Sequence, residues 1–517
     1  MKKVQLLGLC LALLTIGSFL KAQNQNVSGG IVFEGEPFLT QNPANPNHLV
    51  VAWIGFVFQQ PVTIKTRASF DGGLTWSTAN SLPRQASTYK AADPSLAFDA
   101  NGDVLACYIS YRQTPDSGGV YVCRSTDGGL TWNNGSKAID AYADGNNTPI
   151  DRPWMAMDQQ SGNIYVTSMP PSWVALPKRP YIVRSTDTGL TWSNWQYLDG
   201  PSNLVGSQIR APMASPVTSA NGTLHIAYPS YVSSQNIFAG YYMASSSDGG
   251  VTFSYQDIWF GNFSQSDSLI KAGYLLLADP SDANHLAFFV PINLLGDQDI
   301  YMLETTNGGT SWQGPTRVND DPSATGVTQD LVWADFDTDG DLVVTWRDRR
   351  NAVGTGYQVD SEIWGAVLWK DSTQFSPNFA ISDTIAEWNT VLLEAGNDFM
   401  STELNNDTLC AAWGDTRNGR LNIWFTKIDL RGQSATHTFH IADEGLPQVR
   451  ISPNPSKDFW KVEGEGILGI ELYDLNGKLL KAQLNGPVDC QNLENGIFVL
   501  QIKTEMGSLN QKVVVER

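Results

Sequence analysis

Acidic, arginine and aromatic side chains recur beside the short apolar stretches of this sequence, and they are the residues that could do chemistry. A carboxyl group can act as a general acid or base, and a Tyr hydroxyl can act as a nucleophile when a carboxylate takes its proton. Arginine can bind a carboxylate through two parallel hydrogen bonds. The catalytic candidates are Asp93, Asp151 and Tyr111, and the ligand-binding candidates are Arg112, Arg152, Arg210, Arg349 and Arg417.

A repeated motif defines the elements that must position these side chains. The stretch Ser125-Thr-Asp127-Gly-Gly129-Leu-Thr131-Trp132 has related copies before and after it. The motif positions are Asp71, Asp127, Asp187, Asp248 and Asn307, at intervals of 56, 60, 61 and 59 residues. A constant period of this length indicates a repeat architecture.

Each copy of the motif has the composition of a tight turn between two strands. The Asp side chain can accept hydrogen bonds from backbone N–H groups further along the turn, and the Gly that follows can adopt a positive φ without steric cost. Alternating β-branched and aromatic residues precede the motif, as in Val120-Tyr-Val-Cys-Arg124. We therefore expect the five motif positions to be structural.

The motif resembles the Asp-box of sialidases and other Asp-box propellers. The resemblance implies an all-β propeller, in which the boxes staple turns that lie far from the active site. A second motif, a turn followed by a short apolar strand, occurs seven times between residues 26 and 444, for example at Asp341-Leu-Val-Val-Thr-Trp346. Four strands per unit fit a propeller blade. The expected fold is therefore a seven-bladed propeller at 26–444, with six blades as the alternative.

The propeller topology sorts the polar residues onto two faces. Loops that enter the inner strand of a blade and loops that leave the second strand share one face, here called the mouth, and the Asp-box turns lie on the other. The residues expected at the mouth are Glu36, Asp93, Tyr111, Arg112, Asp151, Arg152, Trp173, Arg210, Tyr231, Lys271, Arg347, Asp348, Arg349, Asp415 and Arg417. Such a set suits a polar ligand such as a sugar.

The resemblance to sialidases also implies site residues. Members of that family bind the substrate carboxylate with three arginines, the first in an Arg-x-Pro triplet, which Arg210-Ala211-Pro212 matches. Arg112, Arg349 and Arg417 could supply the other two, by position alone. The family also uses an Asp and a Tyr–Glu pair, for which Tyr111, Tyr231, Glu362, Glu387 and Glu394 are available outside any matching motif. The alternative for Arg349 and Arg417 is an ion pair between blades, since Asp348-Arg349 and Asp415-Thr-Arg417 occupy equivalent places.

Both ends of the chain carry export features. Lys2-Lys3 followed by the apolar run Leu6–Leu20 indicates a signal peptide at 1–22. Residues 446–517 resemble the type A C-terminal sorting domain of the type IX secretion system, in segments such as Ile451-Ser-Pro453-Asn454-Pro455. The resemblance implies a small β-sandwich and export across the outer membrane. We expect a secreted or surface-attached monomer without a transmembrane anchor.

Composition limits the partners and cofactors. The formal net charge of −19 argues against a nucleic-acid partner. No cofactor is expected, and no metal either, because the calcium-loop-like start at Asp335 has Trp346 where a Glu ligand is needed. Cys107 and Cys123 lie on strands joined by a short loop, so they form either a disulfide or two buried thiols.

Three functions fit these observations. The first is a secreted glycan-binding propeller with its site at the mouth. The second is an exo-acting sialidase-type glycoside hydrolase, and the third is a surface scaffold for protein interactions. Whether the chain is an enzyme is left open, because the sequence holds no complete catalytic set.

Overall fold

A computed structural model describes residues 24–431 and 450–515 of the chain. Outside the description lie the two termini, residues 432–449, and the short segments 31–32, 57–59, 113–116, 146–147, 172, 208, 210–212, 233, 235–237, 262–272, 390–396, 465, 475–477 and 505–506. The predicted signal peptide at 1–22 therefore lies outside the described residues. The chain divides into two compact units, residues 1–433 and 434–517, which are considered separately.

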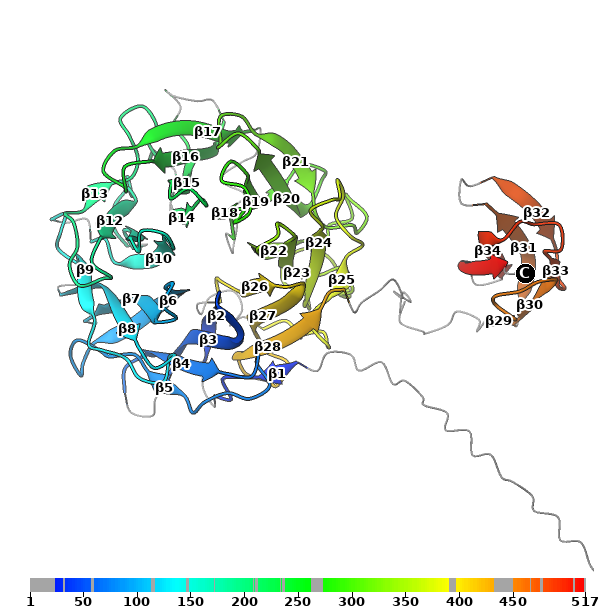
Figure 1. Cartoon of the computed structure of the whole chain (residues 1–517), viewed down its shortest axis with the longest axis horizontal. Helices are drawn as coiled ribbons and strands as arrows, with labels where there is room; N and C mark the ends of the chain where they lie inside the picture. The colour runs from blue at the N-terminus through cyan, green and yellow to red at the C-terminus, as the bar shows by residue number, and fades with distance from the viewer. Residues whose placement is uncertain are drawn as a thin grey trace, which may run out of the picture. The chain divides into compact units, whose positions relative to one another are not determined.

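In the described part of the first unit, seven four-stranded antiparallel sheets surround a common centre (Figure 1). The innermost strands are β2 (Gly35–Asn42), β6 (Lys90–Phe98), β10 (Asp151–Met157), β14 (Ser215–Thr218), β18 (Leu275–Ala278), β22 (Asp330–Phe336) and β26 (Ser401–Asn405). The second strands are β3 (Asn45–Gly55), β7 (Val104–Tyr111), β11 (Ile164–Met169), β15 (Leu224–Ser230), β19 (Leu286–Asn293), β23 (Leu342–Asp348) and β27 (Thr408–Asp415).

Two further strands complete each sheet. The third strands are β4 (Thr63–Ser69), β8 (Gly118–Ser125), β12 (Tyr181–Ser185), β16 (Gly240–Ser246), β20 (Gln298–Thr305), β24 (Glu362–Leu368) and β28 (Asn422–Asp429). The outer strands are β5 (Asn80–Ser81), β9 (Ser136–Asp140), β13 (Gln196–Tyr197), β17 (Ser254–Phe260), β21 (Gln313–Arg317), β25 (Phe379–Ala380) and β1 (Gln25–Asn26). The described residues contain no helix, so the expectation of an all-β fold is confirmed.

One sheet combines both ends of the unit. Its order is β26-β27-β28-β1, and β1 pairs with β28 so that Gln25 lies opposite Phe425 and Asn26 opposite Trp424. The Trp76 indole on the neighbouring sheet donates a hydrogen bond of 3.0 Å to Gln25 Oε1. The beginning of the unit is thus bonded to its end.

The core lies between neighbouring sheets, so the second strands are buried on both faces. This explains why they read as continuous apolar runs instead of alternating ones. Trp53, Trp346 and Trp413 on these strands are at most 1% exposed. The inner strands are then held in a fixed position at the centre of the ring.

The five repeated turns join the third strand to the segment that leads into the outer strand, and they share one hydrogen-bond pattern. In the second copy, Ser125 Oγ donates to Asp127 Oδ1 at 2.8 Å, and the same oxygen accepts from Thr131 N at 2.8 Å. Gly128 and Gly129 have φ angles of 77° and 92°, which side chains with a Cβ rarely adopt. Trp132 donates to Thr66 Oγ1 of the preceding sheet at 3.1 Å, so the turn also ties two sheets together.

The four cysteines among the described residues, Cys107, Cys123, Cys410 and Cys490, are free thiols, all buried. In the β7–β8 register, Cys107 lies opposite Val122 and Cys123 lies opposite Ala106. Side chains alternate between the faces of a sheet, so the two sulfurs point to opposite faces. The disulfide considered from the sequence is therefore not formed.

The second unit is a small two-sheet structure. Its strands are β29 (Arg450–Ser452), β30 (Phe459–Glu463), β31 (Ile467–Tyr473), β32 (Leu479–Gln483), β33 (Val488–Asp489), β34 (Gly496–Thr504) and β35 (Gly507–Val515). The sheets have the orders β29-β30-β33 and β32-β31-β34-β35. Both contribute to one core, which includes Trp460 and Val488 from the first sheet and Leu472 and Leu500 from the second.

Candidate functional site

Four inner strands carry the same irregularity near the end at which the chain enters them. The register of β2, β6, β10 and β22 against the second strand shifts there, as at a β-bulge. At each shift one residue has a positive φ: 53° at Glu36, 56° at Asp93, 44° at Arg152 and 53° at Leu331. Such a conformation costs a residue with a side chain about 1–3 kcal/mol, and it is found most often at functional sites.

Three of these strained residues are charged, and they belong to one group. Arg152 N donates to Asp93 Oδ2 at 3.1 Å, and Arg152 Nη2 donates to Asp398 Oδ2 at 2.5 Å. Asp398 lies just before β26, so the group joins several sheets across the centre of the ring. We call Glu36, Asp93, Asp151, Arg152 and Asp398 the Arg152 cluster. The structure thus brings together Asp93, Asp151 and Arg152, three of the residues selected from the sequence.

The electrostatics of the Arg152 cluster favour the protonated form of two of its acids, Glu36 and Asp151. Glu36 is 4% exposed, and burial together with the charges of Asp93 and Asp398 raises its pKa well above the usual range. Burial, followed by the Asp93 charge, raises the pKa of Asp151 to about 8. Burial opposes the charge on Arg152, but the surrounding carboxylates outweigh this effect and raise its pKa. At neutral pH Asp151 can therefore act as a proton donor within the cluster.

Tyr111 ends β7 next to this cluster and is half-buried. Burial and the charges of Asp93 and Asp151 raise its pKa above the ordinary value of 10. The hydroxyl therefore keeps its proton at neutral pH and suits hydrogen bonding better than nucleophilic attack. Of the glutamates considered as its partner, Glu362 accepts from Asn351 at 2.7 Å and Glu387 is exposed, while Glu394 lies outside the described residues.

The other candidate arginines occupy different environments. Arg112 is exposed directly after β7, and its backbone N–H donates to Ser117 O at 3.2 Å. Arg210, the residue of the Arg-x-Pro triplet, lies outside the described residues, as does Lys271. Of the aromatic candidates, Trp173 is 60% exposed, and Tyr231 is half-buried with its N–H bonded to Val205 O at 2.9 Å.

Arg349 is buried in an ion-pair network at β22 and β23. It is 2% exposed, and its three guanidinium nitrogens donate to Tyr357 O at 3.0 Å, to Thr328 O at 2.9 Å and to the Asp330 carboxylate at 3.3 and 3.4 Å. Arg347 also donates to Asp330, at 2.8 and 2.5 Å. Although burial opposes ionisation, these two arginines lower the pKa of Asp330 to about 2. The network holds its own sheet together.

Arg417 connects neighbouring sheets. Its guanidinium donates to Asp415, to Asp383 and to Asn24 Oδ1 at 2.9 Å, and it lies 4.4 Å from the centre of the Trp424 ring. The equivalent residue in the preceding sheet is Arg350, which donates to Asp348 at 2.8 Å. The shared spacing is Trp-x-Asp-x-Arg, so the sequence comparison that paired Arg349 with Arg417 was shifted by one residue.

Two members of the Arg152 cluster were not selected as site residues from the sequence. Asp398 has no repeat motif to mark it. Glu36 was expected only as a residue of the mouth, although it shares a signal with Asp93 and Arg152. Each of these three charged residues is followed directly by Pro at the start of an inner strand, as Glu36-Pro37, Asp93-Pro94 and Arg152-Pro153.

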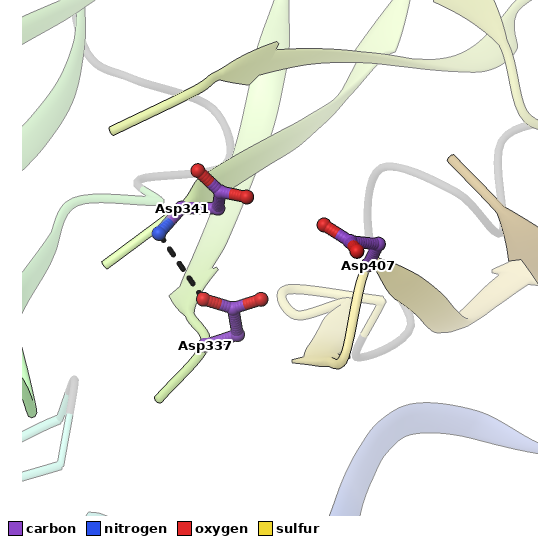
Figure 2. Close-up of side chains that lie close together, drawn as sticks. All are labelled: Asp337, Asp341 and Asp407. Carbon is purple, nitrogen blue, oxygen red and sulfur yellow. Dashed lines mark hydrogen bonds between the residues drawn. The ribbon is translucent and has the colours of Figure 1, made fainter. Parts of the chain in front are cut away.

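A second acidic group lies at the opposite ends of the inner strands, and Figure 2 shows it. Oxygens of Asp337, Asp341 and Asp407 lie within 4.8 Å of one another, and Asp341 N donates to Asp337 Oδ1 at 3.1 Å. Carboxylate oxygens are calcium ligands by type. Here, however, Arg431 pairs with Asp341 at 3.0 Å and with Asp407 at 2.6 Å, which neutralises part of the group.

Residues 450–516 match the family described as the secretion system C-terminal sorting domain. This match confirms the predicted type IX sorting tail and marks the chain for export to the cell surface or beyond. Among the described residues, no helix is long and apolar enough to cross a membrane. No curated protein matches the chain in sequence.

Solved structures similar to this chain include a protein of unknown function from Dyadobacter fermentans, with 15% identity, 68% of this chain and 97% of the other covered, and a TM-score of 0.43. Another is the NanB sialidase from Streptococcus pneumoniae, with 13% identity, 79% and 70% coverage, and a TM-score of 0.40. A third is the α-L-arabinanase of Penicillium chrysogenum, with 13% identity, 79% and 97% coverage, and a TM-score of 0.42. At TM-scores below 0.5 these likenesses assign neither an activity nor a ligand.

Proposed function

We propose that this chain is a secreted glycan-binding β-propeller of seven blades, whose ring is closed by β1, and that the Arg152 cluster binds the glycan. The observation that carries the proposal is the convergence of charged residues from several blades on the centre of the mouth. Glu36, Asp93 and Arg152 reach it from backbone conformations that cost free energy. Packing of the sheets does not require three charged residues with strained backbones in the Arg152 cluster.

The composition of the cluster favours a ligand rich in hydroxyl groups. Asp93 and Asp398 offer acceptors, and the protonated Glu36 and Asp151 offer donors. Arg152 is already paired with Asp398. A cluster with four carboxyl groups and one guanidinium suits neutral sugar hydroxyls better than the carboxylate of a sialic acid.

A glycan array with the purified full-length protein tests this proposal. We expect binding to neutral oligosaccharides, and binding should weaken above pH 8 as Asp151 loses its proton. A Trp173→Ala variant examines whether the exposed ring on the loop after β11 adds a stacking face. A protein that is folded but binds no glycan on the array contradicts the proposal and leaves the interaction-scaffold alternative.

A second candidate function is glycoside hydrolysis, because the cluster combines a protonated carboxyl with neighbouring carboxylates. In that role Asp151 would donate a proton to the leaving oxygen, and the base or nucleophile would be a carboxylate other than Asp93, because Asp93 is hydrogen-bonded directly to Asp151. Hydrolysis of a panel of fluorogenic glycosides, including a sialoside, tests this candidate. If the protein hydrolyses the sialoside and the Arg210→Ala variant does not, the sialidase alternative is supported. If it hydrolyses a neutral glycoside and the Asp151→Asn variant does not, a neutral substrate is supported.

A further inference from the structure

In two of the repeated turns, a side chain of the preceding sheet contacts the carbonyl group of the residue after the motif Asp. In the second copy, His48 Nε2 of the preceding sheet lies 2.9 Å from Gly128 O. In the fourth copy, Arg184 Nη1 donates to Gly249 O at 2.8 Å. At the first copy, a Cβ added to Gly72 would lie 2.4 Å from Lys427 Nζ, so that lysine fills the same space.

The fifth copy, like the third, has no such contact among the described residues, and only the Asn284 side chain lies near Gly308. In the sheet registers, Arg184 pairs with Tyr165, Lys427 with Cys410, and Ser245 with His225. Ser245 therefore occupies the place that Arg184 and Lys427 occupy elsewhere. Among the described hydrogen bonds, no side chain donates to Gly308 O, and the short Ser245 leaves a cavity of about 350 Å³ lined by Gly308, His225 and Gln256.

The walls of this cavity offer acceptors and carry no charge. None of its nine lining residues is acidic or basic at neutral pH, because burial lowers the pKa of His225 to about 4. His225 Nδ1 lies 2.8 Å from Ser245 Oγ. Gln256 Oε1 is buried without a hydrogen-bond partner, and it lies against the fifth turn, 2.9 Å from a Cβ added to Gly309. This oxygen is inaccessible to solvent, and Gln196, at the same register position in the preceding sheet, donates from Nε2 to Gly250 O at 2.9 Å, so Gln256 belongs to the packing between sheets.

We propose that this cavity is a binding site for a guanidinium group, which takes the place that the Arg184 side chain has in the neighbouring blade. A guanidinium presents several N–H donors in one plane. It can therefore donate to the Gly308 carbonyl and to the Ser and Thr hydroxyl oxygens that line the cavity. The group could belong to a free small molecule or to an arginine side chain of a partner protein. This site lies at the Asp-box face and is independent of the Arg152 cluster.

Binding of Nα-acetyl-arginine amide to the full-length protein tests the site, with Nα-acetyl-citrulline amide as the uncharged ligand control. We expect one site for the arginine compound and at least about tenfold weaker binding of the citrulline compound. Ser245→Arg supplies the guanidinium internally and should reduce the affinity by at least about tenfold. Arg184→Ser empties the equivalent place beside Gly249 and should raise the stoichiometry to two.

The two variants make the outcome decisive even if one of them folds poorly. Equal affinity for both ligands, an unchanged affinity in Ser245→Arg, or no binding to either the wild type or Arg184→Ser below about 10 mM would overturn the proposal. A tripeptide with central arginine identifies the source of the group. Tighter binding of the tripeptide supports a protein partner, and equal binding supports a free guanidinium compound.

Discussion

At the scale of single residues, the Arg152 cluster combines two features that are individually unfavourable. Glu36, Asp93 and Arg152 have positive φ angles, and four carboxyl groups are gathered around one guanidinium. Burial raises the pKa of both Glu36 and Asp151, which favours their neutral forms. The stability of the cluster must therefore depend on pH in a direction opposite to that of an ordinary salt-bridged carboxylate.

We predict that replacing Asp151 with Asn flattens the pH dependence of propeller stability. The pKa of Asp151 is raised from about 3.9 in the unfolded chain to about 8 in the folded protein, so its contribution is complete below pH 4 and is lost as the pH rises through 8. One such group contributes a slope of up to about −1.4 kcal/mol per pH unit between these values. Denaturant unfolding at pH 5 to 8 measures the slope, with the exposed Asp371→Asn as the control that leaves it unchanged.

The sequence indicated three residues of the Arg152 cluster, because their charged side chains and their places at the starts of inner strands were enough to select them. Asp93, Asp151 and Arg152 could be assigned to one face from their places relative to the inner strands. Asp398 could not, because only the folded ring brings it to Arg152. Arg349 also follows a second strand and was therefore assigned to the same face. In the structure it is buried and paired with Asp330, which lies 19 residues away in the sequence, so this contact could not be predicted.

At the scale of elements, the repeated turn is a closed set of hydrogen bonds with a side-chain carboxylate at its centre. Asp127 Oδ1 accepts from Ser125 Oγ and Thr131 N, and Asp127 Oδ2 accepts from Thr131 Oγ1 at 2.6 Å. Asn307 keeps the acceptor geometry of the fifth copy, with Ser311 N at 3.0 Å. The fifth copy shows that the charge itself is dispensable.

We expect Asp127→Ala to destabilise the propeller by about 1–3 kcal/mol, because the turn loses three acceptor contacts. Asp127→Asn should recover most of that loss, as the natural Asn307 indicates. Thermal unfolding of the two variants measures the difference. Equal destabilisation by Ala and Asn would show that the charge matters, and unchanged glycan binding in both variants would separate this turn from the site.

The sequence predicted these turns well because their residues bond mainly to one another. It did not predict how the turns contact neighbouring sheets.

The spacing Trp-x-Asp-x-Arg at Trp346 and Trp413 was visible in the sequence, but only the structure shows that Arg350 and Arg417 are the equivalent residues.

At the scale of the whole molecule, the short segment before the first complete sheet has a large structural effect. Strand β1 completes the sheet of β26, β27 and β28, and Val27 beside it is 1% exposed. Asn24 donates from Nδ2 to Ile381 O at 3.1 Å and accepts from Arg417 at 2.9 Å. This segment therefore binds the last sheets to one another.

We predict that a chain beginning at residue 33 is less stable than one beginning at residue 24 by at least about 3 kcal/mol. It loses the β1 pairing, the buried Val27 side chain and the Asn24 bonds. The chain beginning at residue 24 is the matched control and should unfold like the mature protein. Equal melting temperatures for the two chains would show that β1 does not contribute to closure.

The pairing of β1 with β28 could not be predicted from the sequence, because a two-residue strand has no periodicity. The type IX sorting tail was predicted, since its motifs are local and specific. The apolar strand motifs indicated the second strands of the sheets, whereas the pairing of residues about 400 positions apart depends on the fold.

The most direct test of the proposed function compares the affinity of an array-selected glycan for the wild type, Asp93→Asn and Asp337→Asn. Both variants remove one carboxylate charge, the first in the Arg152 cluster and the second at the opposite ends of the inner strands. We predict at least about a tenfold loss of affinity in Asp93→Asn and less than about a twofold change in Asp337→Asn. Equal affinities in all three proteins, or a loss confined to Asp337→Asn, would contradict the assignment of the glycan site to the Arg152 cluster.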